Sequence, residues 1–379
     1  RIFIGVKKER HKQLSWYEGN VYITSYGLLR EDLDIYKEMN FKVMIIDEAQ
    51  NIKNPTAMLT KAVKSINSEV KLALTGTPIE NSILELWSIF DYIMPGFLSN
   101  KSKFKEKYKI GEEFDDTTNL VLSKLRNQVA PFILRRKKNE VLKDLPDKIE
   151  NNIYIDLSEE EKKIYAALVE QTKKEMEELI KAGFTKNKMQ ILTLLTRLRQ
   201  VCIDPKIIFD NFTKTSSKIN HLIDVVSEAI SNGHKILLFT SFKTALNIVK
   251  NELDKEGITS YVIDGSVSSK KRQELVDKFN MDDTNVFLIM LKSGGTGLNL
   301  TSADIVIHLD LWWNPQAENQ ATDRAHRIGQ KNTVEVIKLI TKGTIEEKIL
   351  DLQEKKKILS DKLIENDGDE YQSFQNLSV

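Results

Sequence analysis

Residues 314–330, NPQAENQATDRAHRIGQ, combine amide and guanidinium side chains at a spacing that suits phosphate chemistry. Asn314 can cap a helix, and Pro315 fits the first turn, where its missing N–H group costs nothing. If the helix continues, three polar side chains fall on one face at i, i+4 and i+7: Gln320, Arg324 and Arg327. Guanidinium groups present a rigid fork of donors that matches phosphate oxygens and can stabilise the charge that develops during phosphoryl transfer.

A second interpretation gives these residues no ligand. On an ordinary solvated helix Asp323 would pair with Arg327 at i, i+4, and such a pair contributes little to stability. The preceding residues favour the phosphate interpretation. Residues 286–290 are an apolar run typical of a buried strand, the glycine-rich sequence KSGGTGLNL follows at 292–300, and a second apolar run spans 304–310. A strand that enters such a turn presents backbone N–H groups to a phosphate or ribose.

Paired carboxylates follow another apolar run. Phe41–Ile46 has the composition of a buried strand, and Asp47 and Glu48 come directly after it. In α/β proteins, ligands bind at the carboxyl ends of parallel strands. Because Asp-Glu pairs are common on protein surfaces, the apolar run before this pair is what indicates a site.

A strand-like run at residues 70–74 leads into a short polar turn, Thr75, Gly76 and Thr77. The glycine permits a tight turn, and the two hydroxyls could bond back to the carboxylates after residue 46. The alternative is a loop whose Pro78 starts the next helix. We favour a relay between the two segments.

Composition limits the class of protein. At 379 residues, with 41% hydrophobic and 29% charged residues, the chain can form two or more globular domains. Its net charge is +1, so a nucleic-acid site must be a local patch. The single cysteine, Cys202, excludes an internal disulfide and a cysteine-based zinc cluster, and we assign it to packing.

Localisation is expected to be intracellular. No apolar run approaches the roughly 20 residues needed to cross a bilayer, and residues 1–30 show no signal-peptide pattern. We therefore expect no membrane partner. The expected location is the cytoplasm, in association with the nucleoid, in a bacterium, and the nucleus in a eukaryote.

The ordered motifs resemble those of the Swi/Snf-type DNA translocases, a branch of the superfamily two helicase-like ATPases. SGGTGLNL and QATDRAHRIGQ are similar to the fifth and sixth motifs of that family, and DEAQ and LTGTP to its second and third. The family more often has His where this chain has Gln50. Residues 197–205, RLRQVCIDP, also resemble a family stretch, although relatives often have His in place of Asp204.

The resemblance implies a role for each motif in ATP hydrolysis. Asp47 would hold Mg²⁺ through water, and Glu48 would position the attacking water. Gln50 and the turn at 75–77 would couple the nucleotide state to the DNA state. The opposite wall of an ATP site between two lobes would be formed by Gly297, Asn299, Gln320, Arg324 and Arg327.

Contacts with the backbone of double-stranded DNA are also implied. Residues 21–24 are expected to be a short strand that delivers Thr24 and Ser25 to DNA; the alternative is simply a strand end that starts a helix. Further contacts are implied for Lys53, Thr240, Ser241, Ser293, Gly294, Gly295 and Thr296. Such contacts carry no sequence information. For Trp312 and Trp313, we expect one to pack in the core and the other to lie at the surface or on DNA.

The expected fold is α/β, with two RecA-like parallel-sheet lobes and helical insertions between them. The first lobe is expected to be incomplete. We predict its C-terminal part at 1–95, helical protrusions and a linker at 96–210, the second lobe at 211–345, and a brace helix with a loose tail at 346–379. In the family, the protrusions grip duplex DNA.

No Gly-Lys pair occurs in the sequence, so it contains no GxxxxGK[ST] phosphate loop. We therefore interpret the chain as a fragment of an ATP-dependent double-stranded-DNA translocase that displaces or remodels a DNA-bound protein, which no motif identifies. The fragment alone is expected not to hydrolyse ATP. Two alternatives remain: a DNA-binding module without turnover, and a strand-separating helicase.

Overall fold

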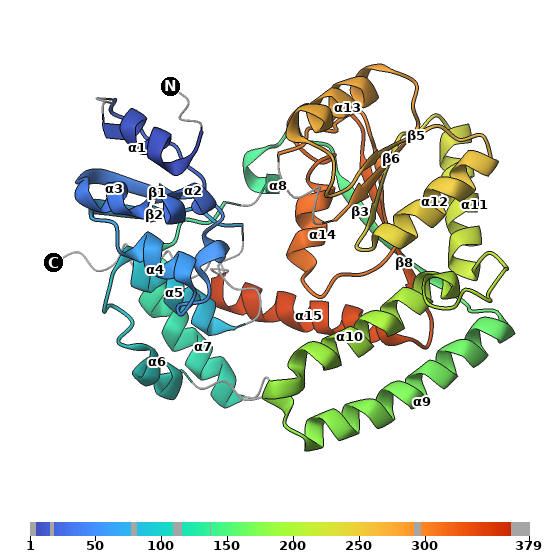
Figure 1. Cartoon of the computed structure of the whole chain (residues 1–379), viewed down its shortest axis with the longest axis horizontal. Helices are drawn as coiled ribbons and strands as arrows, with labels where there is room; N and C mark the ends of the chain where they lie inside the picture. Colours follow the sequence, from blue (N-terminus) through green and yellow to red (C-terminus); the bar gives the residue numbers. More distant parts are fainter. Residues whose placement is uncertain are drawn as a thin grey trace. The chain divides into compact units, whose positions relative to one another are not determined.

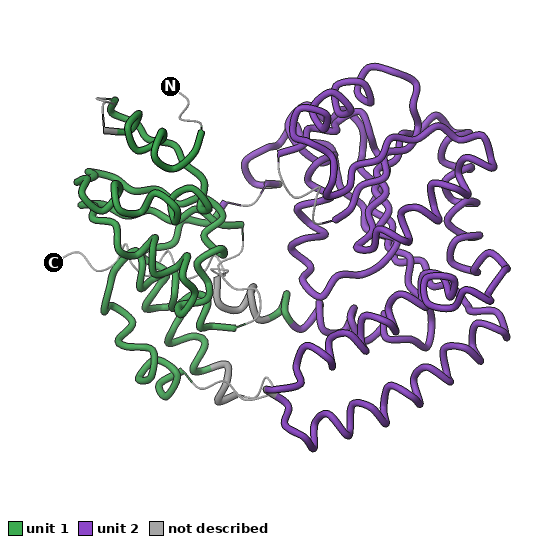
Figure 2. Tube along the Cα trace, in the orientation of Figure 1, with its two compact units in different colours: residues 1–135, 356–379 green, residues 136–355 purple. Residues whose placement is uncertain are grey.

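The computed structural model describes residues 5–15, 19–76, 82–108, 116–136, 138–291 and 297–364. The chain forms two compact units, residues 1–135 with 356–379, and residues 136–355 (Figure 2). The first unit contains a two-stranded parallel sheet and the second a six-stranded parallel sheet. This is the predicted α/β fold with two parallel-sheet lobes, the first of them incomplete.

The sheet of the first unit is formed by β1 (Phe41–Ile46) and β2 (Ser68–Ala73). The helices of this unit are α1 (Lys7–Ser15), α2 (Tyr26–Glu31), α3 (Leu33–Glu38), α4 (Met58–Lys64), α5 (Ile83–Ile93), α6 (Lys101–Lys107) and α7 (Asp116–Val129). A short 3-10 helix, η1 (Ala49–Ile52), follows β1. One face of the sheet packs on α4 and α5 through a core that contains Ile46, Val63 and Ile89.

The opposite face of this sheet is open. Val43 pairs in register with Val70, and Ile45 with Leu72, so these four side chains point to the same side. Each of them is about half exposed (47–57%). Parallel sheets are normally covered by helices on both faces. The apolar open face is therefore the physical sign that the first lobe is incomplete.

The predicted strand at residues 21–24 is wrong. These residues form no strand, and Ile23 is 93% exposed. An isolated extended segment gains neither ladder hydrogen bonds nor apolar burial, so four residues of strand-like composition do not form a strand here. The chain instead starts α2 immediately afterwards.

The second unit is built around β3 (Lys148–Ile155), β4 (Ile236–Thr240), β5 (Ser260–Ile263), β6 (Val286–Met290), β7 (Ile305–His308) and β8 (Val334–Thr341), in the order β3-β8-β7-β4-β6-β5. Strands β3, β5, β6 and β8 are labelled in Figure 1. All neighbouring strands are parallel. Strands β4, β6 and β7 are buried on both faces, which explains why their sequences are nearly continuous apolar runs.

Helices cover both faces of this sheet. Its helices are α8 (Lys138–Val141), α9 (Glu159–Lys181), α10 (Phe184–Ile203), α11 (Ser217–Ser231), α12 (Lys243–Lys255), α13 (Ser269–Met281), α14 (Pro315–Thr322) and, up to residue 355, α15 (Ile345–Ile364). Residues of α11 and α12 pack on one face of the sheet with Leu238. Residues of α13 and α14 pack on the other face with Phe239.

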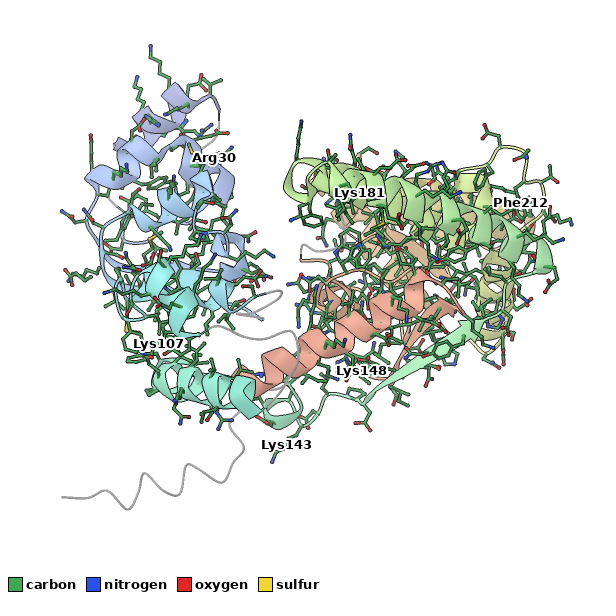
Figure 3. The ribbon with its side chains drawn as sticks, turned by 90° about the horizontal axis from the view of Figure 1, so that it is seen from below. Arg30, Lys107, Lys143, Lys148, Lys181 and Phe212 are labelled. Carbon is green, nitrogen blue, oxygen red and sulfur yellow. The ribbon has the colours of Figure 1, made fainter. Side chains whose placement is uncertain are left out.

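Helices α9 and α10 form a hairpin that contributes no strand to the sheet; Lys181 marks the end of α9 (Figure 3). Leu168 of α9 packs against Leu198 and Val201 of α10. Cys202 is buried, and burial raises the pKa of its thiol, as expected of a cysteine that packs. Among the described residues, no helix is long and apolar enough to span a membrane.

Candidate nucleotide and DNA site

The paired carboxylates lie at the carboxyl end of β1, as predicted. Asp47 is exposed, and its Oδ1 accepts a hydrogen bond from the Glu48 amide at 2.8 Å. Glu48 has a left-handed backbone (φ 50°, ψ 53°), which is uncommon for a residue other than glycine. Amide contacts hold this conformation, because Ala49 donates to the carbonyl of Leu74 at 2.9 Å. Strained backbone of this kind concentrates at functional sites.

Gln50 joins the two polar segments of the first unit. Its Nε2 donates to Glu48 Oε2 at 2.5 Å, and its Oε1 accepts a hydrogen bond from the Thr75 hydroxyl at 2.7 Å. The predicted link between the turn after β2 and the carboxylates therefore exists, but it runs through the Gln50 amide. Gly76 follows, exposed, at the end of the described segment, and Thr77 lies outside the described residues.

The segment before β1 also contacts the backbone of Asp47. The Tyr26 hydroxyl donates to the Asp47 carbonyl at 2.7 Å; burial, and then the negative charges of Asp47 and Glu48, raise the pKa of Tyr26 to about 12. Ser25 caps α2 by accepting from the Leu28 amide at 3.3 Å, and Thr24 beside it is exposed. The structure thus shows Ser25 in the helix-starting role that was the alternative to a DNA contact.

Lys53 ends η1 and is half-buried. Magnesium in nucleotide sites usually takes one or two carboxylates, and phosphates and water supply the rest. Among the described residues, no cluster of three or more His, Cys, Asp or Glu side chains could hold a metal by itself. The exposed carboxylate of Asp47 fits a magnesium ion that is shared with a triphosphate.

Helix α14 begins as predicted and ends early. Asn314 caps it by accepting from the Gln316 amide at 3.1 Å, and Pro315 is its first residue. The helix stops at Thr322, so the prediction that Arg324 and Arg327 share a helical face with Gln320 is wrong. The Arg324 carbonyl, which a longer helix would use internally, instead accepts from the Leu300 amide at 3.0 Å.

The arginine turn, residues 323–330, is fixed against the residues that follow the glycine-rich sequence. Arg327 Nη1 donates to the Leu298 carbonyl at 3.2 Å, beside the bond from the Leu300 amide to the Arg324 carbonyl. Gly297 has φ +65°, a left-handed conformation that favours glycine. The structure therefore joins the segment that carries Gly297 and Asn299 to the segment that carries Arg324 and Arg327.

Contacts made by Gln330 and Lys138 also hold the arginine turn in place. Gln330 is buried, and its Nε2 donates to the carbonyls of Ala303 (2.8 Å) and Ala325 (3.2 Å). Lys138 forms an ion pair with Asp323 and donates to the His326 carbonyl at 3.2 Å. Asp323 thus pairs with Lys138, and the i, i+4 pair with Arg327 considered as an alternative does not form, because the helix has already ended.

Asp310, two residues beyond β7, accepts hydrogen bonds from polar groups at the end of β4. Its Oδ1 accepts from the Thr240 hydroxyl at 2.8 Å and from the Ser241 amide at 2.9 Å. The Oδ2 atom accepts from Arg199 Nη2 at 2.8 Å. The side chains of Asp310 and Arg199 are 0% and 2% exposed. Thr240, predicted to contact DNA, is itself buried and uses its hydroxyl on this carboxylate.

Sequence reasoning missed Asp310 as a site residue and noted Arg199 only as part of a family-like stretch. They lie 111 residues apart, and no local spacing links them. The four predicted residues 293–296 lie outside the described residues. The remaining predicted residues end or follow β1, β2, β4, β6 or β7, or precede β1, and they are divided between the two units.

Comparison with known proteins gives two family matches. Residues 2–207 match the SNF2-related domain, and residues 217–329 match the helicase conserved C-terminal domain. Two curated relatives are bacterial. An uncharacterized ATP-dependent helicase of Mycoplasma pneumoniae is 41% identical over 97% of this chain, and the putative ATP-dependent helicase/translocase YwqA of Bacillus subtilis is 38% identical over 92%.

A solved structure, the Sulfolobus solfataricus SWI2/SNF2 ATPase core in complex with dsDNA, is 36% identical, with a TM-score of 0.50, over 98% of this chain and 82% of that one. The chain spans only 35% of the Mycoplasma relative and 38% of the Bacillus relative. The first family match alone covers more than half of the chain and contains the β1 carboxylates, and the second contains the glycine-rich sequence and residues 323–329 of the arginine turn. The chain therefore belongs to the SNF2-related family of ATP-dependent helicases and translocases.

Proposed function

We propose that the intact protein is an ATPase that is stimulated by double-stranded DNA, translocates along the duplex and displaces or remodels proteins bound to it. This chain would be the C-terminal part of the motor. The observation that carries the proposal is the joining of residues 297–300 to the arginine turn by two hydrogen bonds, in a chain whose paired carboxylates follow a parallel strand. The parallel-sheet rule for ligand sites supports it.

In this proposal the predicted residues fall into two groups with different tasks in ATP hydrolysis. Glu48 would orient the attacking water, and Asp47 would hold a magnesium ion, which would supply positive charge to the phosphates. Arg324 and Arg327 meet the charge that develops on the transferred phosphoryl group, and Gln320 and Asn299 bind the nucleotide. The hydrogen bonds from Thr75 to Gln50 and from Gln50 to Glu48 link the turn after β2 to the proposed catalytic carboxylate. Phosphoryl transfer depends mainly on positioned charge, so these roles need no covalent step.

Such a motor would bind duplex DNA independently of the base sequence, because the protein would contact only the phosphate backbone. The candidates are Thr24, Ser25, Lys53, Ser241 and, outside the described residues, 293–296. Because the net charge is only +1, binding depends on this local site. Raising salt from about 50 to about 200 mM should weaken duplex binding more than tenfold, while changing the duplex sequence should not.

The test is ATP turnover by the intact protein with and without duplex DNA. We expect duplex DNA to raise kcat, and Arg324→Lys or Arg327→Lys to lower kcat by about 10³-fold, because lysine keeps the charge but loses the fork of donors. Lys250→Met, on α12 of the same unit and outside the proposed site, is the control for a substitution at a basic residue and should turn over normally.

The alternatives give different results. Duplex binding without turnover would indicate a DNA-binding module, and separation of a forked duplex would indicate a strand-separating helicase. Without a GxxxxGK[ST] loop, the isolated fragment should not hydrolyse ATP. Turnover by the pure fragment would contradict this part of the proposal.

A further inference from the structure

The segment that leads from β7 into α14 is held by a buried cation. Arg199 of α10 donates from Nη2 to Asp310 Oδ2 at 2.8 Å and to the Leu311 carbonyl at 2.7 Å. Its guanidinium carbon lies 5.0 Å from the Phe242 ring and 5.0 Å from the Trp312 ring. The Trp313 ring follows at 5.8 Å. One arginine thus ties the α9–α10 hairpin to the ends of β4 and β7.

The same segment is held from its other side by α14 and α15. Glu318 Oε1 accepts from the Trp312 amide at 2.7 Å and from Gln353 Nε2 at 2.7 Å. Gln353 Nε2 also donates to the Trp312 carbonyl at 2.6 Å. Glu318 Oε2 lies 3.1 Å from Lys338 Nζ, and the Glu318 side chain is only 1% exposed. Both backbone groups of Trp312 are therefore fixed.

A buried ion pair of this kind is poor evidence for stability, because desolvation offsets much of the attraction between the charges. An apolar side chain could fill the same volume. What an apolar residue could not do is hold Asp310 and the Leu311 carbonyl with one rigid group while three aromatic rings surround it. The arrangement therefore favours a role in geometry over a role in stability.

We infer that Arg199 is a positioning residue that couples the α9–α10 hairpin to the nucleotide-facing side chains. Helix α14 begins two residues after Trp313 and delivers Gln320 and then the arginine turn. A shift of α10 moves Arg199, Arg199 moves residues 310–313, and α14 follows. This inference rests on the proposed function, because it requires that the hairpin binds duplex DNA and that this binding changes the position of residues at the ATP site.

The experiment must separate positioning from stability. Arg199→Met alone leaves Asp310 buried and unpaired, so loss of activity could reflect unfolding. The double variant Arg199→Met/Asp310→Asn removes both charges, while the asparagine Oδ1 can still accept from Thr240 and Ser241. Its matched control is Lys250→Met/Asp254→Asn, which removes a partly exposed i, i+4 pair from α12 of the same unit.

Measured in the intact protein, the double variant should keep duplex affinity and the KM for ATP within about threefold and lose about tenfold or more in DNA-stimulated kcat, since small misplacement of reacting groups is costly. Arg199→Lys should not rescue stimulation. If wild type is stimulated and the double variant turns over within about twofold of the control pair, the inference is overturned while the proposed function stands. An unstimulated wild type overturns both.

Discussion

Gln50 occupies the central place in the polar chain of the first unit, since its amide donates to Glu48 and accepts from Thr75. Gln50→Leu keeps the volume and removes both bonds. We expect kcat of the intact protein to fall about tenfold, because Glu48 loses its orienting donor. Gln50→His, which can still donate and accept, should remain within about threefold of wild type in a steady-state ATPase assay. Equal turnover by the leucine and histidine variants would contradict this role.

His308 is completely buried at the end of β7, beside the Thr322 hydroxyl at 3.2 Å and stacked on Phe239. Burial, and then the charge of Lys338, lower the pKa of this imidazole to about 3. The unfolded chain, with a pKa near 6.5, binds the proton first as pH falls. The free energy of unfolding should therefore decrease between about pH 6.5 and pH 3, by up to about 1.4 kcal/mol per pH unit.

The variant His308→Asn removes this titration. Urea unfolding at several pH values should show a shallower acid slope for the variant than for wild type. Met281, which is 88% exposed and does not titrate, provides the control, and Met281→Thr should keep the wild-type slope between about pH 6 and pH 5. A parallel decline of wild type and His308→Asn would show that other groups dominate.

At the scale of elements, Lys218 of α11 and Glu346 of α15 form a buried ion pair with both carboxylate oxygens 2.7 Å from Nζ. The side chains are 0% and 1% exposed, and Glu346 Oε2 also accepts from the Thr341 amide. Lys218→Met should cost about 3–5 kcal/mol in the free energy of unfolding, because it leaves a buried carboxylate unpaired. Lys218→Met/Glu346→Gln should recover most of that loss.

The exposed pair of Lys162 and Glu159 on α9 is the comparison for this experiment. Replacing both members of the exposed pair should leave the urea midpoint unchanged. If the buried double variant proved as unstable as Lys218→Met alone, the loss would come from packing and not from the unpaired charge.

The open face of the β1–β2 sheet predicts how the fragment behaves in solution. Side chains of Val43, Ile45, Val70 and Leu72 form a contiguous half-exposed apolar strip, and such surfaces bind hydrophobic dyes. Val43→Thr/Leu72→Thr should reduce ANS fluorescence of the folded fragment. Met281→Thr removes a lone residue that is 88% exposed and should have no effect. Unchanged dye binding by the double variant would place the dye elsewhere.

Elements with long apolar runs could be predicted from the sequence, because burial on both faces demands them. β6 has the expected bounds, residues 286–290, and β1 coincides with the run Phe41–Ile46. The early end of α14 could not be predicted, since it depends on the Leu300 amide taking the Arg324 carbonyl. The roles of Asp310 and Glu318 could not be predicted for the same reason, because the partners of Asp310 come from two distant segments and those of Glu318 from three.

At the scale of the whole molecule, the motifs fall in two units. The carboxylates and the Gln50 chain lie in the first, and residues 297–330 lie in the second. The carboxylates lie within the match to the SNF2-related domain, and Arg324 and Arg327 lie within the match to the helicase conserved C-terminal domain. Each group follows a parallel strand of its own unit, where α/β proteins bind ligands.

The most direct measurement is a structure of the intact protein with duplex DNA and a nonhydrolysable ATP analogue. We expect one triphosphate to be contacted by Asp47 and Glu48, directly or through Mg²⁺ and water, and by the guanidinium groups of Arg324 and Arg327. A nucleotide bound by the first unit alone, with both arginines directed to a surface that no rotation of the second unit could bring to the phosphates, would contradict the account.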